Sequence, residues 1–425
     1  MADSRLINLL RGWPSPTVLP ASLLSGACQR VLADATASTS VLQYGPDRGH
    51  QPLREGLASW LAQQYGVGRD AERICITGGA SQSLACILQS FTDPSYTRAV
   101  WIVEPCYHLG CGIFEDAGFG GRLRAAPGDE EGVDVDGLER MMKEVDELAD
   151  ETPEQQTMLK VPGPTRKIYR HVIYCVATCS NPSGITMSLR RRESLVRLAR
   201  SHDALIISDD VYDFLQWPLQ GDAHLGVPTL PRLCDVDLAM GLQDGPFGHA
   251  ISNGSFSKIA GPGMRTGWVE ASTAFVAGLG DTASTLSGGA AKAYRRGASA
   301  HLVPLGFQAR ESSLAGSDWY GGYFIWLTAS STTTTMPPPR LVAEAAMREA
   351  SVVIGPGTMF EVRGDERRTR FDGEIRLCFA WEEEEALVQG VRRLGLLLKR
   401  MQEDRGYYDG LVASYGQGAK LDEYK

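Results

Sequence analysis

The middle of the chain alternates short apolar runs with stretches in which apolar residues recur every three or four positions. The runs end in polar or turn residues, which is typical of buried strands, and they occupy residues 99–105, 171–178, 204–210 and 249–255. Helical spacing occurs in residues 53–66, 81–91 and 188–202. Strands that alternate with helices predict an α/β fold, with a mainly parallel sheet sandwiched by helices.

The pattern changes beyond residue 305. Apolar runs predict short strands at residues 321–327, 351–357 and 375–381, and helical spacing predicts helices at 341–350 and near 383–402. We therefore expect a smaller α+β unit, followed by a polar tail. Residues 141–170 begin as a helix and become acidic and proline-bearing, which predicts a mobile surface excursion in their second half.

Composition narrows the class of protein. The chain has 425 residues, a net charge of −9 and 43% hydrophobic residues, which suits a soluble protein of two or three lobes. Its richest basic cluster is RRRE at 190–193, so a nucleic-acid partner is not expected. The N-terminal segment lacks the pattern of a signal peptide, and no apolar run approaches the roughly 18 residues that a membrane span needs.

Cysteine and histidine usage adds two expectations. The nine cysteines include no CxxC pair, and the closest pairs, Cys106/Cys111 and Cys175/Cys179, lie beside or within predicted strands, where buried reduced thiols are common. This favours a reducing, cytoplasmic location. The seven histidines show no metal-binding spacing, so no metal is expected.

Lys258 is the first candidate for chemistry, because it follows an apolar run and stands among small and hydroxylated residues. A desolvated lysine at a strand end has a lowered pKa and is nucleophilic toward carbonyl groups. Ser255, Ser257 and Arg265 could bind a phosphate beside it. Most lysines are solvated surface groups, so the hypothesis that Lys258 is reactive depends on Ser255, Ser257 and Arg265 beside it.

Two other motifs suit the same chemistry. Gly78 and Gly79 separate a short strand from a helix, which would expose the N–H groups of Ala80 and Ser81 to a phosphate. A purely structural glycine turn is the alternative.

Asp209 closes a predicted strand, where a buried carboxylate could keep a pyridine nitrogen protonated. Tyr212 and Asn181 could bond a phenolic oxygen. A helix cap at Asp209 and a turn at Asn181 are the simpler interpretations.

The ordered set of motifs resembles the class I/II aminotransferase family of fold-type I pyridoxal-phosphate enzymes, and within it the kynurenine, 2-aminoadipate and valine–pyruvate aminotransferase branch. The matching stretches span nearly the whole chain and are GWPSP (12–16), YGPDRGHQPLR (44–54), TGGASQSL (77–84), EPCYHLG (104–110), NPSG (181–184), DDVY (209–212), SFSKIAGPGMRTGW (255–268), GGYFIW (321–326) and IRLCFAW (375–381). Each motif alone is weak, and their order is what makes the resemblance specific.

The resemblance implies pyridoxal 5'-phosphate (PLP) as cofactor and assigns catalytic residues. Lys258 would form the internal aldimine and then move the proton from the substrate Cα. Asp209 would pair with the pyridinium nitrogen. Tyr212 and Asn181 would bond the ring oxygen, and Tyr107 would stack on the ring.

The resemblance also implies the remaining binding residues. The phosphate would be held by Ala80, Ser81, Ser255, Ser257 and Arg265, and in a homodimer by Tyr44 of the neighbouring subunit. Arg376 would clamp the substrate α-carboxylate, and Gly12 and Asn181 would line the substrate pocket. Trp13, Tyr44 and Tyr107 would leave room for an aromatic or long aliphatic side chain.

Four segments follow from the resemblance. Residues 1–45 would pack with the small domain, 46–290 would form the large PLP-binding domain, 291–403 the small domain and 404–425 a polar tail. The interval from Arg265 to Gly321 is about 30 residues shorter than the family pattern, or about 45 Å of helix. A deletion or a mis-spliced product would explain it, with a shortened linking helix.

The expected function is transfer of an amino group between an L-amino acid and a 2-oxo acid through Lys258. Two alternatives stay open at this stage. One is another PLP reaction, namely that of a C–S lyase, a decarboxylase or a carbon–carbon bond-forming enzyme of a biosynthetic pathway. The other is a variant that binds the cofactor and fails to close its active site.

Overall fold

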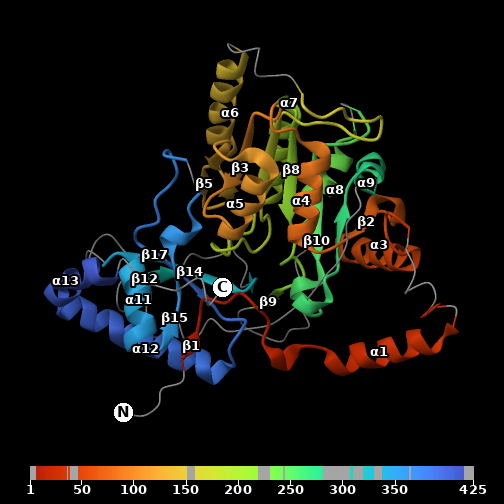
Figure 1. Cartoon of the computed structure of the whole chain (residues 1–425). Coiled ribbons are helices and arrows are strands. Elements are labelled where there is room, and N and C mark those ends of the chain that lie inside the picture. The colour runs from red at the N-terminus through yellow and green to blue at the C-terminus, as the bar shows by residue number, and fades with distance from the viewer. Residues whose placement is uncertain are drawn as a thin grey trace.

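The computed structural model describes residues 6–35, 37–38, 46–150, 158–218, 230–242, 245–280, 307–309, 319–329, 337–362 and 365–415. A seven-stranded sheet forms the centre of this described part (Figure 1). Its strands, in spatial order, are β2 (Ile74–Thr77), β11 (Gly267–Glu270), β10 (Ala250–Ser255), β8 (Ala204–Asp209), β7 (His171–Cys175), β3 (Ala99–Val103) and β4 (Leu123–Ala126). The strands from β10 to β4 pair in parallel, and β11 is antiparallel to both neighbours.

Helices cover both faces of the large sheet (Figure 1). One layer consists of α4 (Ala80–Phe91), α5 (His108–Phe114) and α9 (Thr273–Gly280), and the other of α6 (Val135–Asp150), α7 (Leu189–Ser201) and α8 (Leu233–Ala239). Side chains of β8 alternate between them, since Leu205 packs with the first layer and Ile206 with the second. Helix α3 (Gln51–Tyr65) packs on the edge strand β2. The predicted α/β sandwich is confirmed.

A smaller unit is built on an antiparallel sheet. Its strands are β12 (Phe307–Ala309), β14 (Phe324–Ala329), β17 (Glu374–Cys378) and β16 (Gly355–Pro356), and its helices are α11 (Pro339–Glu349), α12 (Glu384–Glu403) and α13 (Arg405–Tyr415). The N-terminal segment joins this unit, because β1 (Ile7–Asn8) pairs in parallel with β15 (Val352–Val353). Ile7, Leu9 and Leu10 lie in the same apolar cluster as α11 and α12.

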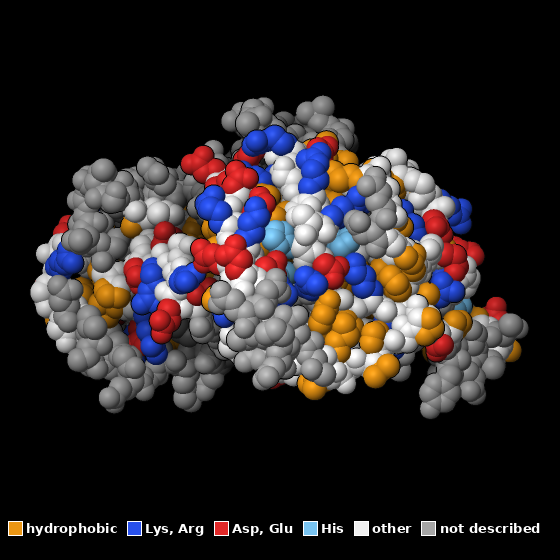
Figure 2. Space-filling view, turned by 90° about the horizontal axis from the view of Figure 1, so that it is seen from above, with side chains coloured by type: hydrophobic (Ala, Val, Ile, Leu, Met, Phe, Trp, Pro, Cys, Tyr) orange, Lys and Arg blue, Asp and Glu red, His pale blue; other side chains and the backbone are white. Residues whose placement is uncertain are grey.

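Two further strand pairs and one further helix belong to the described part. Strand β9 (Gln216–Pro218) pairs with β13 (Trp319–Gly321), and β5 (Gly128–Asp129) pairs with β6 (Gly132–Val133). Helix α1 (Ala21–Ala33) has no buried residue and extends along the lower right of Figure 1. No helix in the described ranges has the length and apolar character needed to cross a membrane. On the face seen in Figure 2, basic and acidic side chains are interspersed and form no basic stripe.

Two segments differ from the sequence expectations. Residues 158–170 are irregular but anchored, because Asp93 Oδ2 accepts hydrogen bonds from the backbone N–H groups of Leu159 and Lys160 at 2.9 and 2.7 Å. The expected polar tail begins as helix α13, where Tyr408 is buried and donates to Glu349 Oε2 at 2.8 Å. The predicted shortening of the linking helix falls largely on residues outside the described ranges.

Candidate active site

A cavity of about 180 Å³ lies where the carboxyl-terminal side of the large sheet meets the small sheet and the N-terminal segment. Ligands bind at this edge of α/β sheets because parallel strands deliver their following loops to one place. Most of the residues predicted from the sequence line it, namely Gly12, Ala80, Ser81, Tyr107, Asn181, Asp209, Tyr212, Ser257, Lys258 and Arg376.

Lys258 ends a short 3-10 turn that follows β10, and its side chain enters the cavity. Ser255 Oγ caps the turn by accepting a hydrogen bond from the Ser257 backbone N–H at 3.0 Å. Lys258 Nζ donates to the carbonyl oxygen of Gly12 at 2.9 Å. Burial lowers the pKa of this amine to about 8, because a desolvated ammonium loses its hydration. At pH 7 about a tenth of Lys258 is therefore the neutral, nucleophilic amine.

Asp209 is the last residue of β8 and is 8% exposed. Its Oδ2 accepts a hydrogen bond from the Tyr174 hydroxyl at 2.7 Å, while Oδ1 is buried without a hydrogen-bond partner in the described part of the chain. Burial raises the pKa of the carboxyl group to about 6. A buried oxygen without a donor costs free energy, so this geometry fits an N–H donor that enters the cavity, as a protonated pyridine ring would.

The N-terminus of α4 opens into the same cavity. Gly79 occupies the N-cap position at φ 78°, where a side chain would be strained, and no side chain caps the helix. The N–H groups of the first turn thus have no intrahelical acceptor, and Ala80 and Ser81 line the cavity. Such a helix start favours an anion, so these two residues fit a phosphate group.

Arg376 reaches the cavity from β17 of the small sheet. Its Nη1 donates to Asn181 Oδ1 at 3.0 Å, and its Nη2 donates to the carbonyl oxygen of Leu10. The guanidinium carbon lies 4.0 Å from the centre of the Phe324 ring. Burial lowers the pKa of Arg376 to about 10, which still leaves it charged at neutral pH. A fixed guanidinium of this kind can bind a carboxylate through two parallel hydrogen bonds.

Two tyrosines face the lysine and the carboxylate. Tyr107 precedes α5 and lines the cavity, and burial raises the pKa of its hydroxyl to about 12. Tyr212 is buried, and burial also raises its pKa well above the usual value. The centre of the Tyr212 ring lies 5.6 Å from Lys258 Nζ. Both hydroxyls are therefore neutral at physiological pH and available as hydrogen-bond donors.

Two of the predicted residues do not line the cavity in this structure. Ser255 is buried beneath the turn that it caps. Arg265 lies on an exposed turn at φ 47°, outside the cavity lining. Tyr44 lies outside the described residues.

Sequence reasoning missed several residues of the site. Tyr174 lies inside a predicted strand, and its contact with Asp209 could be predicted only from the register of β7 and β8. Tyr174 pairs with Ile207, and the side chain of Ile207 lies on the same face of the sheet as that of Asp209, two residues later. Phe324 and Tyr323 belong to the GGYFIW motif, but the sequence indicated no role for either side chain in the site. The Tyr323 ring centre lies 4.7 Å from Lys258 Nζ. Arg11 also lines the cavity and carried no expectation.

Comparison with known proteins agrees with this geometry. A family model described as aminotransferase class I and II matches residues 16–303. An uncharacterised protein of Saccharomyces cerevisiae is 30% identical, over 92% of this chain and 97% of its own length. The 2-aminoadipate transaminase of Thermus thermophilus is 26% identical, over 93% of this chain and 90% of its own length.

A solved structure shares the fold. The α-aminoadipate aminotransferase of Thermus thermophilus, complexed with N-(5'-phosphopyridoxyl)-L-leucine, superposes with a TM-score of 0.64 at 23% identity, covering 93% of this chain and 92% of that one. The relatives and the structure named above give no support for a lyase, a decarboxylase or a carbon–carbon bond-forming enzyme. With more than half of its length matched by the family model, the chain belongs to the class I and II aminotransferase family and is an aminotransferase.

Proposed function

We propose that this chain binds PLP in the cavity around Lys258 and uses it to transfer an amino group between an L-amino acid and a 2-oxo acid. The observation that carries the proposal is the pairing, in one cavity, of a lysine with a lowered pKa and a buried carboxylate oxygen to which no described residue donates. PLP, when bound, supplies an aldehyde that bonds amines and a ring that accepts the electron pair left at Cα.

Lys258 performs two tasks in this proposal. Its neutral amine would hold the cofactor, and when free it would accept the proton from the substrate Cα and later return it. The Gly12 carbonyl oxygen, 2.9 Å from Nζ, keeps the amine oriented into the cavity. Asp209 would hold the protonated ring nitrogen, since its Oδ1 has no hydrogen-bond partner among the described residues while the Tyr174 hydroxyl donates to Oδ2.

Other residues hold and orient the two ligands. Since Asn181 Oδ1 accepts from Arg376, its amide N–H₂ remains a donor and would bind the ring oxygen together with the Tyr212 hydroxyl. Tyr107, which lines the same cavity, would contact the ring. We assign the phosphate to Ala80, Ser81, Ser255, Ser257 and Arg265, of which Ser255 and Arg265 lie outside the cavity lining in this structure and would have to turn toward the phosphate. Arg376 binds the α-carboxylate beside Gly12 and Asn181.

The proposal includes a homodimer in the cytoplasm, with Tyr44 contributing to the phosphate site of the partner. Helix α1 supports the dimer, because it exposes apolar side chains such as Leu23 and Leu32, at 74% and 55%. All nine cysteines are free thiols, which favours a reducing compartment.

The visible absorption spectrum tests the proposal. Purified protein mixed with PLP should develop an absorption band that a suitable L-amino acid shifts to the pyridoxamine form, with one 2-oxo acid released for each site. A second 2-oxo acid should restore the first band. Lys258→Ala should lose both the stable band and turnover.

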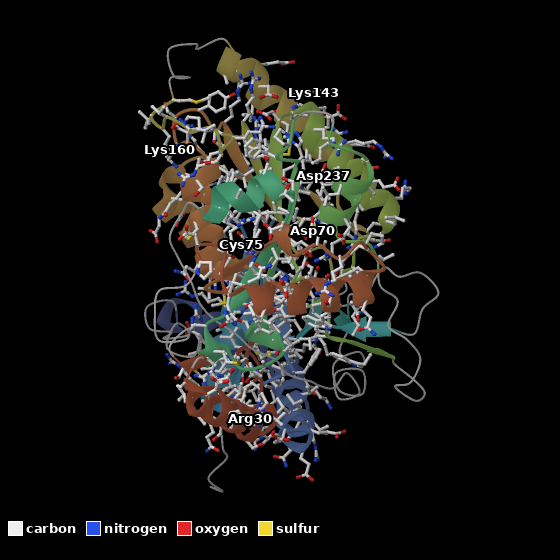
Figure 3. The ribbon with its side chains drawn as sticks, turned by 90° about the vertical axis from the view of Figure 1, so that its right-hand side faces the viewer. Arg30, Asp70, Cys75, Lys143, Lys160 and Asp237 are labelled. Carbon is white, nitrogen blue, oxygen red and sulfur yellow. The ribbon has the colours of Figure 1, made fainter. Side chains whose placement is uncertain are left out.

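Lys160 provides the matched control. It is also a lysine whose pKa is lowered by burial, but its Nζ donates to the backbone carbonyl of Thr92 at 2.6 Å, outside the cavity lining (Figure 3). Lys160→Ala should therefore keep the spectrum and the turnover. Release of ammonia, thiol or CO₂ in place of a new amino acid would contradict transamination.

A further inference from the structure

The connection between β16 and β17 of the small unit contacts the large sheet. It is described for residues 357–362 and 365–373, and in Figure 1 it rises in blue from the small unit toward the large sheet. The backbone N–H groups of Val362 and Thr369 in this connection donate to the two carboxylate oxygens of one residue, Glu104, at 3.0 and 2.8 Å. Because Glu104 directly follows β3, a single side chain joins the large sheet to the small unit at two points.

Glu104 is firmly placed on the large-sheet side of this contact. Its backbone N–H donates to the Ala126 carbonyl oxygen of β4 at 3.1 Å, and its side chain is buried. Burial raises the pKa of the Glu104 carboxyl, and the N–H groups of Val362 and Thr369 oppose that rise. Each oxygen accepts one N–H, which a carboxylate can do and an amide cannot, since an amide has one oxygen and would turn its N–H₂ toward the second donor.

Phe360, two residues before Val362, carries this contact to Arg376. Its carbonyl oxygen accepts hydrogen bonds from the Cys106 backbone N–H at 3.1 Å and from the Cys106 thiol at 3.2 Å. Its ring is buried, and the ring centre lies 4.7 Å from the guanidinium carbon of Arg376. An aromatic ring at this distance orients a guanidinium. The short segment from Phe360 to Val362 is therefore fixed to the large sheet and supports the arginine at the same time.

The two ends of the site come from different units. Lys258 and Asp209 follow or end strands of the large sheet, whereas Arg376 belongs to β17 of the small sheet. Glu104 is not among the described residues that line the cavity, so it acts on a ligand only through other residues. The span from the cofactor to the α-carboxylate depends on how the units are joined, and an error of about 1 Å there can cost on the order of 100-fold.

We propose that Glu104 is a positioning residue for substrate binding: through the N–H groups of the β16–β17 connection it holds the Phe360 ring against Arg376, and so keeps the guanidinium where it meets the substrate α-carboxylate. This role rests on the proposed function, which places the α-carboxylate at Arg376. Attachment of the cofactor to Lys258 does not depend on Glu104, because both ends of that contact lie on the large unit.

Two amines that differ only in the α-carboxylate test Glu104. L-Phenylalanine and 2-phenylethylamine both bind the PLP-loaded protein through their amine, and stopped-flow absorbance gives the apparent Kd of each. The wild type should bind L-phenylalanine more tightly, because only this ligand has a carboxylate for Arg376. Glu104→Gln should weaken L-phenylalanine by about 10-fold to 100-fold, and it should leave the affinity for 2-phenylethylamine and the PLP absorption band unchanged.

Two further variants separate positioning from a general loss of contact between the units. Phe360→Leu should also weaken L-phenylalanine selectively, and adding Glu104→Gln to it should weaken this ligand no further, because residues that act through one another are not additive. Asp365→Asn is the matched control. The Asp365 carboxylate also accepts an N–H of the large sheet, from Ala125 at 2.8 Å, but farther along the connection from Phe360, so the ratio of the two affinities should not change.

An equal loss of both amines in Glu104→Gln would overturn the positioning role, since that result indicates a structural one. Additive losses in the double variant would overturn it as well. Equal binding of the two amines by the wild type would overturn it whether or not any variant folds, because Arg376 would then bind no α-carboxylate. Failure of the proposed function gives a different result, the absence of a PLP absorption band in the wild type, and would overturn the positioning role with it.

Discussion

Lys258 Nζ donates to the carbonyl oxygen of Gly12 at 2.9 Å, across 246 positions of the chain. The lysine follows a strand of the large sheet, whereas Gly12 belongs to a segment that is paired with the small unit. This single hydrogen bond therefore joins the two parts of the molecule at the site of the chemistry. The position of the small unit and the orientation of the reactive amine should depend on each other.

Gly12→Ala should damage the site through Phe324. A Cβ at position 12 would lie 2.6 Å from Phe324 Cζ, and the Phe324 ring also supports the Arg376 guanidinium. We expect a loss of about 1–3 kcal/mol in the free energy of unfolding, and a rise in KM for amino-acid substrates, since overpacking moves the neighbouring side chains. Thermal unfolding and steady-state kinetics measure both effects.

Gly26→Ala on the exposed helix α1 is the matched control. A Cβ there meets nothing closer than Arg30 Nη1 at 3.5 Å (Arg30 is labelled in Figure 3). This variant should be as stable as the wild type or more so, because alanine favours helix over glycine by about 1 kcal/mol. Equal behaviour of the two variants would contradict the role of the contact between Gly12 and Phe324.

Tyr174→Phe should shift the pH dependence of PLP binding. Burial raises the pKa of Asp209 to about 6, and the Tyr174 hydroxyl opposes that rise by donating to Oδ2. Without the donor the pKa rises further, so less carboxylate remains at pH 6 than in the wild type. We expect a loss of about tenfold or more in PLP affinity at pH 6 and a smaller loss at pH 8. Absorbance titrations with PLP at both pH values measure it.

Tyr169→Phe separates this effect from a general loss of stability. Tyr169 is also buried, but its hydroxyl donates to the Gly248 carbonyl at 2.6 Å, away from the cavity. Its loss should lower the unfolding temperature and leave the pH dependence of PLP binding unchanged. A parallel shift in both variants would disprove a specific effect on Asp209.

The rate of PLP attachment should follow the neutral amine of Lys258. Because burial lowers the pKa of Lys258 to about 8, the rate should rise with pH up to about 8 and level off above it. About a tenth of the amine is neutral at pH 7, far more than for a solvated lysine with a pKa near 10.4. Stopped-flow absorbance at a series of pH values measures the profile. A rate that keeps rising to pH 10 would show that Lys258 is not desolvated.

Arg376→Lys should separate substrate binding from cofactor binding. Lysine keeps the charge but cannot donate to Asn181, to Leu10 and to a carboxylate in the same planar geometry. We expect kcat/KM for amino acids to fall by about 100-fold, with the PLP absorption band retained. Loss of the band with unchanged kcat/KM would contradict the assignment of Arg376 to the α-carboxylate.

Much of this site could be predicted from the sequence, because the sequence indicates where the buried strands end. Asp209 and Lys258 each follow an apolar run, and the parallel sheet brings them to one edge as expected. The contacts between distant segments could not be predicted. Asn181 binds Arg376 and Gly12 binds Lys258 only because the small unit packs on the large sheet, which no local pattern encodes.

The remaining differences have physical causes as well. Arg265 lies close to Lys258 in the sequence. Its backbone, however, adopts a left-handed conformation on an exposed turn, and its side chain does not line the cavity. The segment after residue 404 contains charged residues and glycines, and this composition gave no sign that Tyr408 would be buried there. The sequence pattern predicts neither the direction in which a side chain such as that of Arg265 points nor the burial of a single residue such as Tyr408.

Borohydride reduction of the PLP-loaded protein, followed by mass spectrometry of its peptides, identifies the lysine that holds the cofactor. We expect a reduced pyridoxyl group on Lys258, with Lys160 unmodified, and no stable labelling of Lys258→Ala. Labelling of another lysine, or equal labelling in Lys258→Ala, would contradict the role of Lys258.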